Sequence, residues 1–383
     1  MLETLKKMMK SLQFRFDLYY DLYPGAWRYL LSYASYVFLR VIGFSNNRIE
    51  KNIEICELLT QRYSTYNVLN GLNLRLEKED SPFDLAKACF ELHGVYPISF
   101  VLMRESYVQN NSEPKGQLIS KVIPGKPYSF SEENRLYEEY RNSDFAFTFR
   151  KCGWDSYRNL EILFQRCFPL YLDAKKIPRF CMTFYPKNQI QRVTESFLAS
   201  PFSLSKDFKE NFFSTALKQL DSRFLGEYLL SCVGFLPKKI LFYDENLDIF
   251  RGDYQSMMTL KALFQIPDVE VTIVQELEYL FSRQYDQDDL YGRGFGYRGL
   301  LDGVKVRREA NFNIQLSDYF DWVVAGSAAR NMNFIQSLDS RLSDKTLMIW
   351  GEDRPPTRKE LHILRSKSKH CFVRELTHPF VVP

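Results

Sequence analysis

Residues 144–187 read DFAFTFRKCGWDSYRNLEILFQRCFPLYLDAKKIPRFCMTFYPK, and this stretch decides the fold expected for the first half of the chain. The apolar run 145–149 predicts a strand, and a basic turn that contains Gly153 follows it. A helix is expected to begin near Trp154, and a second short strand covers 168–172. Because backbone N–H groups and the positive end of a helix dipole converge at a strand–glycine–helix turn, the sequence predicts an anion site there.

Charged residues recur at helical spacing just after this turn. Asp155, Arg158 and Glu161 are spaced i, i+3 and i+6, so they are expected on one stripe of the helix. A cation for phosphate and a carboxylate for a ribose hydroxyl on one stripe suit a nucleotide. Trp154 or Tyr157 would cover the base, and Asp155 has the alternative role of capping the helix. The plain alternative for the whole group is a capped helix with surface Arg/Glu pairs.

Composition indicates a globular protein. A chain of 383 residues with 45% hydrophobic and 26% charged residues is long enough for two ordinary domains, each with its own core. The net charge of +4 is nearly balanced, so we expect no nucleic-acid partner. Seven scattered cysteines without a CxxC pair indicate reduced thiols, a cytoplasmic location and no structural zinc.

The first 65 residues predict a helical N-terminal extension, with helices over 3–20, 26–43 and 47–63. Charged residues such as Lys6 interrupt any early apolar run, so no signal peptide is expected. The segment 26–44, AWRYLLSYASYVFLRVIGF, is aromatic and apolar. It is expected to pack on its own protein, and the alternative is a helix that lies in the membrane interface, with peripheral contact at the cytoplasmic face.

A first Rossmann-like domain is expected over 66–230. Its predicted elements are a helix between Ser81 and Gly94, a buried strand over 97–103, a loop over 110–128, a helix between Ser131 and Asn142, and helices over 186–198 and 203–232.

The second domain, 231–383, alternates strands and helices. Five short apolar strands are expected at 238–243, 269–274, 322–325, 346–350 and 371–373, which indicates a parallel, doubly wound sheet. In such sheets ligands bind beyond the carboxyl ends of the strands. The residues just past these ends are expected to line a cleft, although surface loops have a similar composition: Asp244, Glu245, Gly326, Ser327, Gly351, Glu352, Asp353, Arg374 and Glu375.

Several sequence blocks resemble an exostosin-like group of bacterial and viral glycosyltransferases. GWDSYRNLEIL (153–163), followed by a strand, an Asp and FYPK (184–187), resembles the pattern GWDxxRxxEIL…D…P…PK of that group. The blocks LYGRGFGY (290–297), AGSAAR (325–330), GEDR (351–354) and FVREL (372–376) resemble its other half. In that group the YGRGF and GED block precedes the GWD block, so here the order is exchanged. Either the chain is a circular permutation of the same two-domain enzyme, or it joins halves that derive from different neighbours of that group. Some bacterial Kdo transferases are similar in architecture alone.

The resemblance implies an α/β fold of two Rossmann-like domains of the GT-B type, with the two halves in exchanged order, and a glycosyltransferase that needs no metal or cofactor. Its substrates would be a nucleotide-sugar donor and a glycan or glycolipid acceptor. The catalytic candidates are Asp244, Glu352 and Asp353. The donor-binding candidates are Arg150, Lys151, Gly153, Trp154, Asp155, Arg158 and Glu161, and the acceptor- or sugar-binding candidates are Gly292, Arg293, Gly294, Gly326, Ser327 and Arg374.

Two other classes of function stay open. One is a non-catalytic carbohydrate- or nucleotide-binding protein on the same two-domain scaffold, and the other is an interaction protein built on aromatic surfaces. Asp286-Gln287-Asp288 matches the DxD metal motif of another glycosyltransferase type, but it follows no apolar strand, so no metal site is expected there. The chain has no GxxxxGK[ST] P-loop and no GxSxG elbow.

Overall fold

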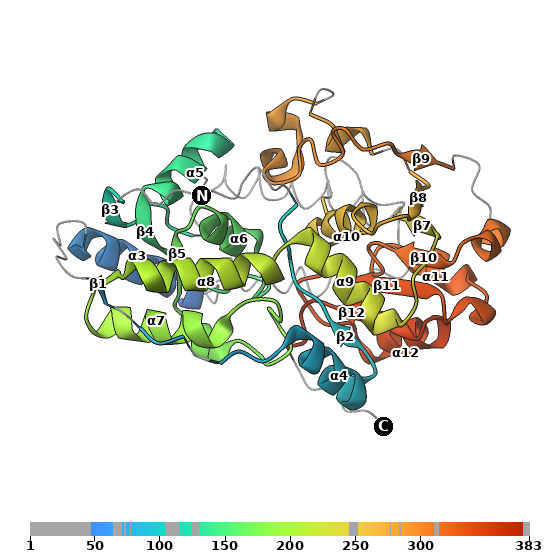
Figure 1. The fold of residues 1–383 in the computed structure, drawn as a ribbon, viewed down its shortest axis with the longest axis horizontal. Coiled ribbons are helices and arrows are strands. Elements are labelled where there is room, and N and C mark those ends of the chain that lie inside the picture. Colours follow the sequence, from blue (N-terminus) through green and yellow to red (C-terminus); the bar gives the residue numbers. More distant parts are fainter. Residues whose placement is uncertain are drawn as a thin grey trace, which may run out of the picture. The chain divides into compact units, whose positions relative to one another are not determined.

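A computed structural model of the chain describes residues 47–63, 71–72, 74–76, 78–103, 115–124, 130–244, 252–275, 277–282, 285–309 and 314–377 (Figure 1). The aromatic segment 26–44 and most of the expected extension 1–65 lie outside these residues. The last expected helix of the extension is α3 (Asn47–Tyr63). No helix within the described ranges is long and apolar enough to cross a membrane.

A parallel sheet dominates the second half of the chain. Within the described residues it has seven strands, and every neighbouring pair in it is parallel. In spatial order the strands are β2 (Tyr96–Pro97), β12 (His370–Val373), β11 (Thr346–Trp350), β10 (Trp322–Ala325), β7 (Lys239–Tyr243), β8 (Glu270–Ile273) and β9 (Arg307–Arg308). The predicted parallel α/β sheet is therefore confirmed.

The chain reverses its direction of progress across this sheet between β7 and β10. From β7 it builds outward through β8 to β9, and then returns to β10 and builds the other way through β11 to β12. This is the order 3-2-1-4-5-6 of doubly wound sheets, with β2 added at one edge. The switch point lies between the carboxyl ends of β7 and β10, which is where such sheets bind ligands.

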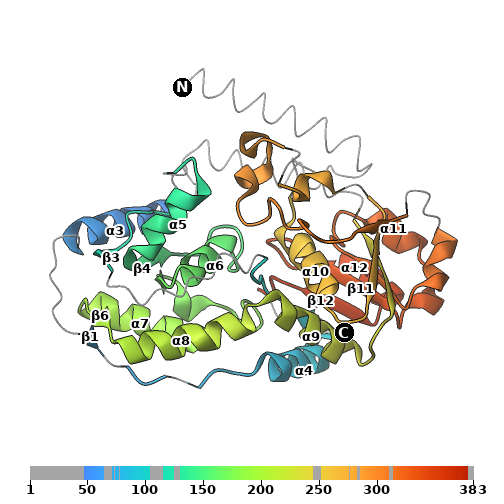
Figure 2. The same ribbon diagram turned by 45° about the horizontal axis from the view of Figure 1, so that its top comes forward.

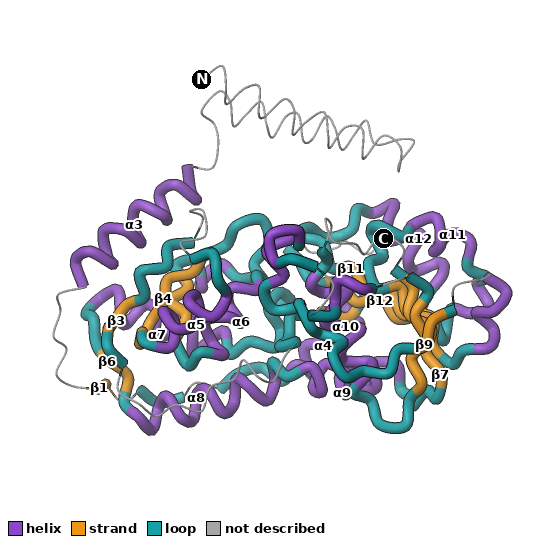
Figure 3. The backbone as a smooth tube through the Cα atoms, turned by 90° about the horizontal axis from the view of Figure 1, so that it is seen from above, coloured by secondary structure: helices purple, strands orange, loops and turns teal. Residues whose placement is uncertain are grey.

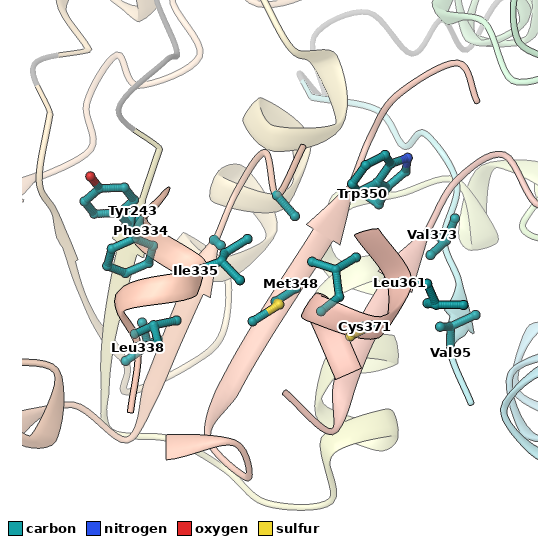
Figure 4. Packing of buried hydrophobic residues seen from close by; sticks show 14 of the residues in the cluster. Val95, Tyr243, Phe334, Ile335, Leu338, Met348, Trp350, Leu361, Cys371 and Val373 are labelled. Atoms are coloured by element: carbon teal, nitrogen blue, oxygen red, sulfur yellow. The ribbon is translucent and has the colours of Figure 1, made fainter. Parts of the chain in front are cut away.

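Helices cover both faces of the sheet. On one face, Leu241, Val323 and Met348 belong to one apolar cluster with side chains of α11 (Met332–Ser337) and α12 (Arg358–Lys367). Figure 4 shows Met348 of this cluster with Ile335 of α11 and Leu361 of α12. On the other face, Tyr228 of α9 (Ser222–Val233) lies 6.3 Å from the ring of Phe372. There α9 packs closely on α10 (Tyr254–Phe264), since a Cβ on Gly226 would lie 3.2 Å from the Ala262 carbonyl oxygen.

The sheet also contains a strand from the first half of the chain. Helix α4 (Pro82–His93) is capped by Ser81 and Gly94 as the sequence predicts, lies beside α9 (Figure 2) and leads into β2. Strand β2 pairs with β12, with Tyr96 opposite Phe372. This pairing crosses the expected domain boundary at residue 230. The strand expected over 97–103 is shorter than predicted, because after Ile98 the backbone turns to other partners.

Residues 144–187 supply most of β4 (Ser143–Thr148) and all of β5 (Phe168–Tyr171). Together with β3 (Gln117–Ile119) these strands form a separate parallel sheet, visible as its own group of strands in Figure 3. The prediction of a loop over 110–128 was wrong, because β3 lies in this segment and pairs with β4. Three residues are too few to show a strand periodicity. The helices of this region are α5 (Glu133–Arg141), α6 (Tyr157–Phe164), the η2 turn (Ala174–Lys176), α7 (Lys187–Ala199) and α8 (Lys206–Gln219).

The long helix expected over 203–232 was also wrong. Strand β6 (Ser203–Leu204) pairs with β1 (Gly71–Leu72), and the helix divides into α8 and α9. The break at Leu220 is stabilised on both sides. The Asp221 carboxylate accepts from the N–H of Arg223 at 2.7 Å and caps α9, and the N–H of Leu102 donates to the Leu220 carbonyl at 2.7 Å.

Candidate functional site

The carboxyl ends of the two sheets meet at the turn between β4 and α6. Strand β4 runs into the residues before Asp155, and β12 runs into Arg374 and Glu375. The backbone N–H of Asp155 donates to the Glu375 carboxylate at 2.9 Å, and the Arg374 guanidinium donates to the Asp155 carbonyl. The structure therefore brings together candidate residues from the two halves of the sequence.

The predicted anion site holds one of the protein's own carboxylates. Glu375 is completely buried and accepts backbone hydrogen bonds from Trp154 and Asp155. A Cβ on Gly153 would lie only 2.8 Å from carboxylate oxygens of both Glu375 and Asp353, so the turn requires glycine. Burial raises the pKa of Glu375, and Arg374 opposes the rise. The turn is thus an anion-binding turn, as predicted, with an internal occupant.

Arg374 is used inside the protein. Its guanidinium donates to the Gly351 carbonyl at 2.9 Å, to Glu375 at 3.1 Å and to Asp353. Its carbon Cζ lies 4.4 Å from the centre of the Phe100 ring. Because these partners surround a side chain that is only 2% exposed, Arg374 holds the two sheets together where the sequence predicted a sugar-binding residue.

Asp155 lies before α6 and not on it. The helix begins at Tyr157, its N-terminal cap is Ser156, and the Asp155 carboxylate accepts from the N–H of Phe100 at 2.7 Å. Burial raises the pKa of Asp155 to about 7, against the lowering effect of Arg374. The expected stripe of three charges is therefore reduced to the two residues on the helix, and the expected cap is wrong.

Those two residues are Arg158 and Glu161. Glu161 is 8% exposed, and burial raises its pKa to about 7 while Arg158 lowers it. Lys151, in the turn before the helix, is exposed at the surface. Packing around its ammonium group and the neighbouring positive charge of Arg158 lower the pKa of Lys151 to about 8. Neither Lys151 nor Arg158 forms an ion pair within the described part of the chain.

The aromatic residues predicted to cover a base are buried. Trp154 is 3% exposed and lies under Arg150, whose Cζ is 4.9 Å from the ring centre. Tyr157 is 9% exposed and stacks on Tyr254 with ring centres 4.8 Å apart. Neither ring presents a free face, so the expectation that one of them covers a base was wrong.

Asp244 lies at the switch point, where β7 ends. It is 1% exposed, and its two carboxylate oxygens accept from the hydroxyl of Ser256 and from the amide of Asn331, the latter at 2.8 Å. Burial raises the pKa of Asp244 to about 6, and the Ser256 hydrogen bond lowers it. A Cβ on Gly326 would lie 2.4 Å from both Phe242 and the Ser256 hydroxyl, so the strand ends and α10 are in direct contact here.

The other two catalytic candidates reach the surface where β11 ends. The Glu352 side chain is 30% exposed, with an oxygen 3.5 Å from Nε of Arg330. Burial raises the pKa of Glu352, and Arg330 lowers it. The Asp353 side chain is 56% exposed and pairs with Arg374. Of the three predicted carboxylates, these two are accessible to a substrate.

The block 290–297 forms a tight turn beside this surface. Gly292, Arg293 and Gly294 have φ of 57°, 59° and 70°, so all three backbones are left-handed. Arg293 lies 3.8 Å from Asp288, inside the acidic segment that resembled a DxD motif. Tyr291, which the sequence did not single out, is 47% exposed at the start of the turn. Its signal was its place as the first aromatic residue of a glycine-rich block.

Two buried groups near the switch point have unused hydrogen-bonding capacity. Both the nitrogen and the oxygen of the Gln255 amide, in the first turn of α10, lack a partner among the described residues. The same is true of the hydroxyl of Ser327, which is 1% exposed. Ser327 was predicted and Gln255 was missed, because a glutamine in a helix carries no distinctive signal.

A pocket of about 140 Å³ lies elsewhere, between the start of α7 and the segment before α4. Glu79 accepts there from the N–H groups of Asn188 and Gln189 and so occupies the N-terminus of α7. None of the predicted site residues lines this pocket. In the described ranges no three His, Cys, Asp or Glu side chains are grouped so that they could hold a metal ion.

No protein-family model, curated protein sequence or solved structure matches the chain. The arrangement of the residues themselves is therefore the basis for assigning a function.

Proposed function

We propose that the chain is a glycosyltransferase of GT-B-like architecture that transfers a sugar from a nucleotide-activated donor to a glycan or lipid-linked acceptor. The observation that carries the proposal is the contact between the carboxyl ends of two parallel sheets, made through Asp155 and Glu375. Ligands of parallel sheets bind outside these ends. The Gly153 turn, which follows Lys151, lies against Asp353 at the end of β11. A cation without an ion pair among the described residues and an accessible carboxylate thus come from the two sheets, as transfer from an anionic donor requires.

The cations serve the donor. The positive charge of Arg158 adds to the effect of burial in lowering the pKa of Lys151, and neither side chain forms an ion pair among the described residues, so an entering phosphate would relieve their repulsion. During transfer the bond between the anomeric carbon and the phosphate oxygen breaks, and negative charge develops on the nucleotide. Cations fixed at this place stabilise that charge. Glu161, next to Arg158, supplies a carboxylate for a ribose hydroxyl.

Glu352 is the best candidate for the base. As the acceptor oxygen bonds to the anomeric carbon, its proton must leave, and a carboxylate within reach of solvent with a raised pKa is suited to accept it. Asp353 is the neighbouring alternative. Asp244 is better suited to positioning, because both of its oxygens are already bound by Ser256 and Asn331.

The second candidate is a non-catalytic sugar- or nucleotide-binding protein on the same scaffold. It is favoured by the internal use of Arg374 and Glu375, two strand-end residues that face each other and not a ligand. Release of nucleotide from UDP-, GDP- and CMP-sugars separates the two. An enzyme releases nucleotide from at least one donor, and its Glu352→Gln variant does not. A binding protein is thermally stabilised by a donor but releases no nucleotide from it.

We further propose that the protein acts in the cytoplasm, at the face of a membrane that carries its acceptor. The support is the aromatic, apolar sequence of residues 26–44. Co-flotation of the full chain with anionic vesicles, compared with a variant in which two of these aromatic residues are replaced by serine, tests this part independently of catalysis.

A further inference from the structure

Tyr291 presents a flat apolar face beside the accessible carboxylates. Its side chain is 47% exposed, and its ring lies against the backbone of Gly252, where a Cβ would come within 2.8 Å of the ring. The residue after Gly252 is Asp253, whose carboxylate oxygens would lie 2.9 and 3.2 Å from a Cβ on Gly351, at the end of β11 and directly before Glu352. The ring therefore lies at the carboxyl edge of the large sheet, next to the residues proposed to carry out the transfer.

The ring is held in place by its own turn. The Tyr291 carbonyl accepts from the hydroxyl of Tyr297 at 2.7 Å. The next two residues, Gly292 and Arg293, are both left-handed, an unfavourable conformation for arginine. The ring of Tyr254 lies 6.3 Å away and is itself stacked on Tyr157. A side chain fixed from three sides loses little conformational freedom when a ligand covers it.

Hydrogen-bonding groups lie at the same end of the sheet. Asp353 and Glu352 offer carboxylate oxygens that reach solvent. Beneath them, the Gln255 amide lacks any partner among the described residues, and its Cβ lies next to Gly351, at the end of the same strand. An amide offers both donors and acceptors, and carboxylates accept from hydroxyl groups. The neighbourhood thus combines one apolar plane with several groups that bind hydroxyls.

We propose that Tyr291 is the stacking platform of an acceptor-sugar subsite, in which its ring covers the C–H face of a pyranose and the carboxylates of Asp353 and Glu352 bind its hydroxyls. A pyranose has one apolar face and a rim of hydroxyls, so it matches both features, and the nucleosides in the test below are the competing flat ligands. The proposal rests on the glycosyltransferase function and names the chemical class of its acceptor as a carbohydrate.

Saturation-transfer NMR on the full chain tests the subsite. The probes are the methyl glycosides of glucose, galactose, mannose and N-acetylglucosamine, with uridine and guanosine as the nucleobase arm. The Tyr291→Ala variant removes the ring and Tyr291→Phe keeps it. Tyr319→Ala is the control, because this tyrosine is 61% exposed and lies just before β10, so that it is at the amino ends of the strands, opposite the carboxyl ends where Tyr291 lies.

At least one glycoside should bind the wild type, bind Tyr291→Phe and Tyr319→Ala equally well, and lose about tenfold in affinity for Tyr291→Ala, as expected for one stacked ring. The proposal is overturned if no glycoside binds, if Tyr291→Ala binds normally, or if only the nucleosides depend on Tyr291. Nucleotide release from sugar donors, measured on the same variants, separates the two levels. If nucleotide is released but glycoside binding does not depend on Tyr291, only the subsite proposal is contradicted. If glycoside binding depends on Tyr291 but no nucleotide is released, only the transferase function is contradicted.

Discussion

The backbone N–H of Asp155 and the carboxylate of Glu375, 220 positions apart in the sequence, form a hydrogen bond of 2.9 Å. This bond joins the turn after β4 to the end of β12, and the buried guanidinium of Arg374 reinforces it by donating to the Asp155 carbonyl. One guanidinium thus lies among the carboxylates of Asp155, Asp353 and Glu375. The stability of the contact between the two sheets depends on that single positive charge.

Replacing Arg374 by alanine should lower the free energy of unfolding by roughly 3–5 kcal/mol, because it leaves buried carboxylates without their cation. Urea unfolding measures the change. Arg341→Ala is the control, since Arg341 forms an exposed pair with Asp339 and its loss should leave the midpoint unchanged. Equal effects of the two substitutions would show that the Arg374 network does not hold the sheets together.

The buried carboxyls predict a stability that falls as pH rises. Burial raises the pKa of Asp155 from 3.8 to about 7, and raises those of Glu161 and Asp244 to about 7 and about 6. The folded protein therefore holds protons that the unfolded chain has released between about pH 4 and pH 7, so the free energy of unfolding decreases with pH across this window.

Asp155→Asn tests the largest of these contributions. Asparagine keeps an oxygen that can accept from the N–H of Phe100 but cannot ionise. The variant should lose less stability than the wild type between about pH 4 and pH 8, as followed by urea unfolding at several pH values. A wild type whose stability rises over this range, or a variant with the same slope, would contradict the assignment of a buried, titrating Asp155.

Much of the fold was predictable because it depends on local signals. Strands β10 and β11 have the bounds that their apolar runs predicted, and Ser81 and Gly94 cap α4 as their residue types indicate. What the sequence could not show is non-local pairing. Strand β2 has only two residues and exists because Tyr96 meets β12, which is formed from the end of the chain.

The candidate site was predictable to the same extent. The strand ends and the Gly153 turn were each singled out as places for a ligand, but the sequence did not predict that they contact each other. That Glu375 fills the anion turn follows from two sheets facing each other, and no spacing within either sequence block contains this information. The exposure of the aromatic residues could not be predicted from the sequence either. Trp154 and Tyr291 are similar as residue types, and only the packing of the fold buries the first and leaves the second accessible.

Gly153→Ala should destabilise the fold by about 1–3 kcal/mol, because its methyl group would be forced against oxygens of Asp353 and Glu375. Thermal unfolding measures the loss. The neighbouring exposed residue supplies the control, since Cys152→Ala adds no atom to the contact and should leave the melting temperature as it is. A tolerated alanine at position 153 would mean that the turn and the end of β12 are not packed together.

Lys151→Ala and Arg158→Ala should each raise the KM for the sugar donor about ten- to hundredfold, the expected loss for one charge-assisted hydrogen bond to phosphate. The kcat should fall as well, because these cations are proposed to stabilise the charge that develops on the leaving nucleotide. Lys175→Ala, which removes an exposed lysine from the distant η2 turn, serves as the control for a change in net charge. An unchanged KM in both variants would move the donor away from this turn.

The most direct test of the central claim is the release of nucleotide from a panel of UDP-, GDP- and CMP-sugars by the wild type and by Glu352→Gln. The account predicts turnover of at least one donor by the wild type and a fall of about 10²- to 10⁴-fold in kcat for the variant, with an unchanged melting temperature. Full activity of Glu352→Gln, or a wild type that neither releases nucleotide from any donor nor gains thermal stability with any of them, would contradict it.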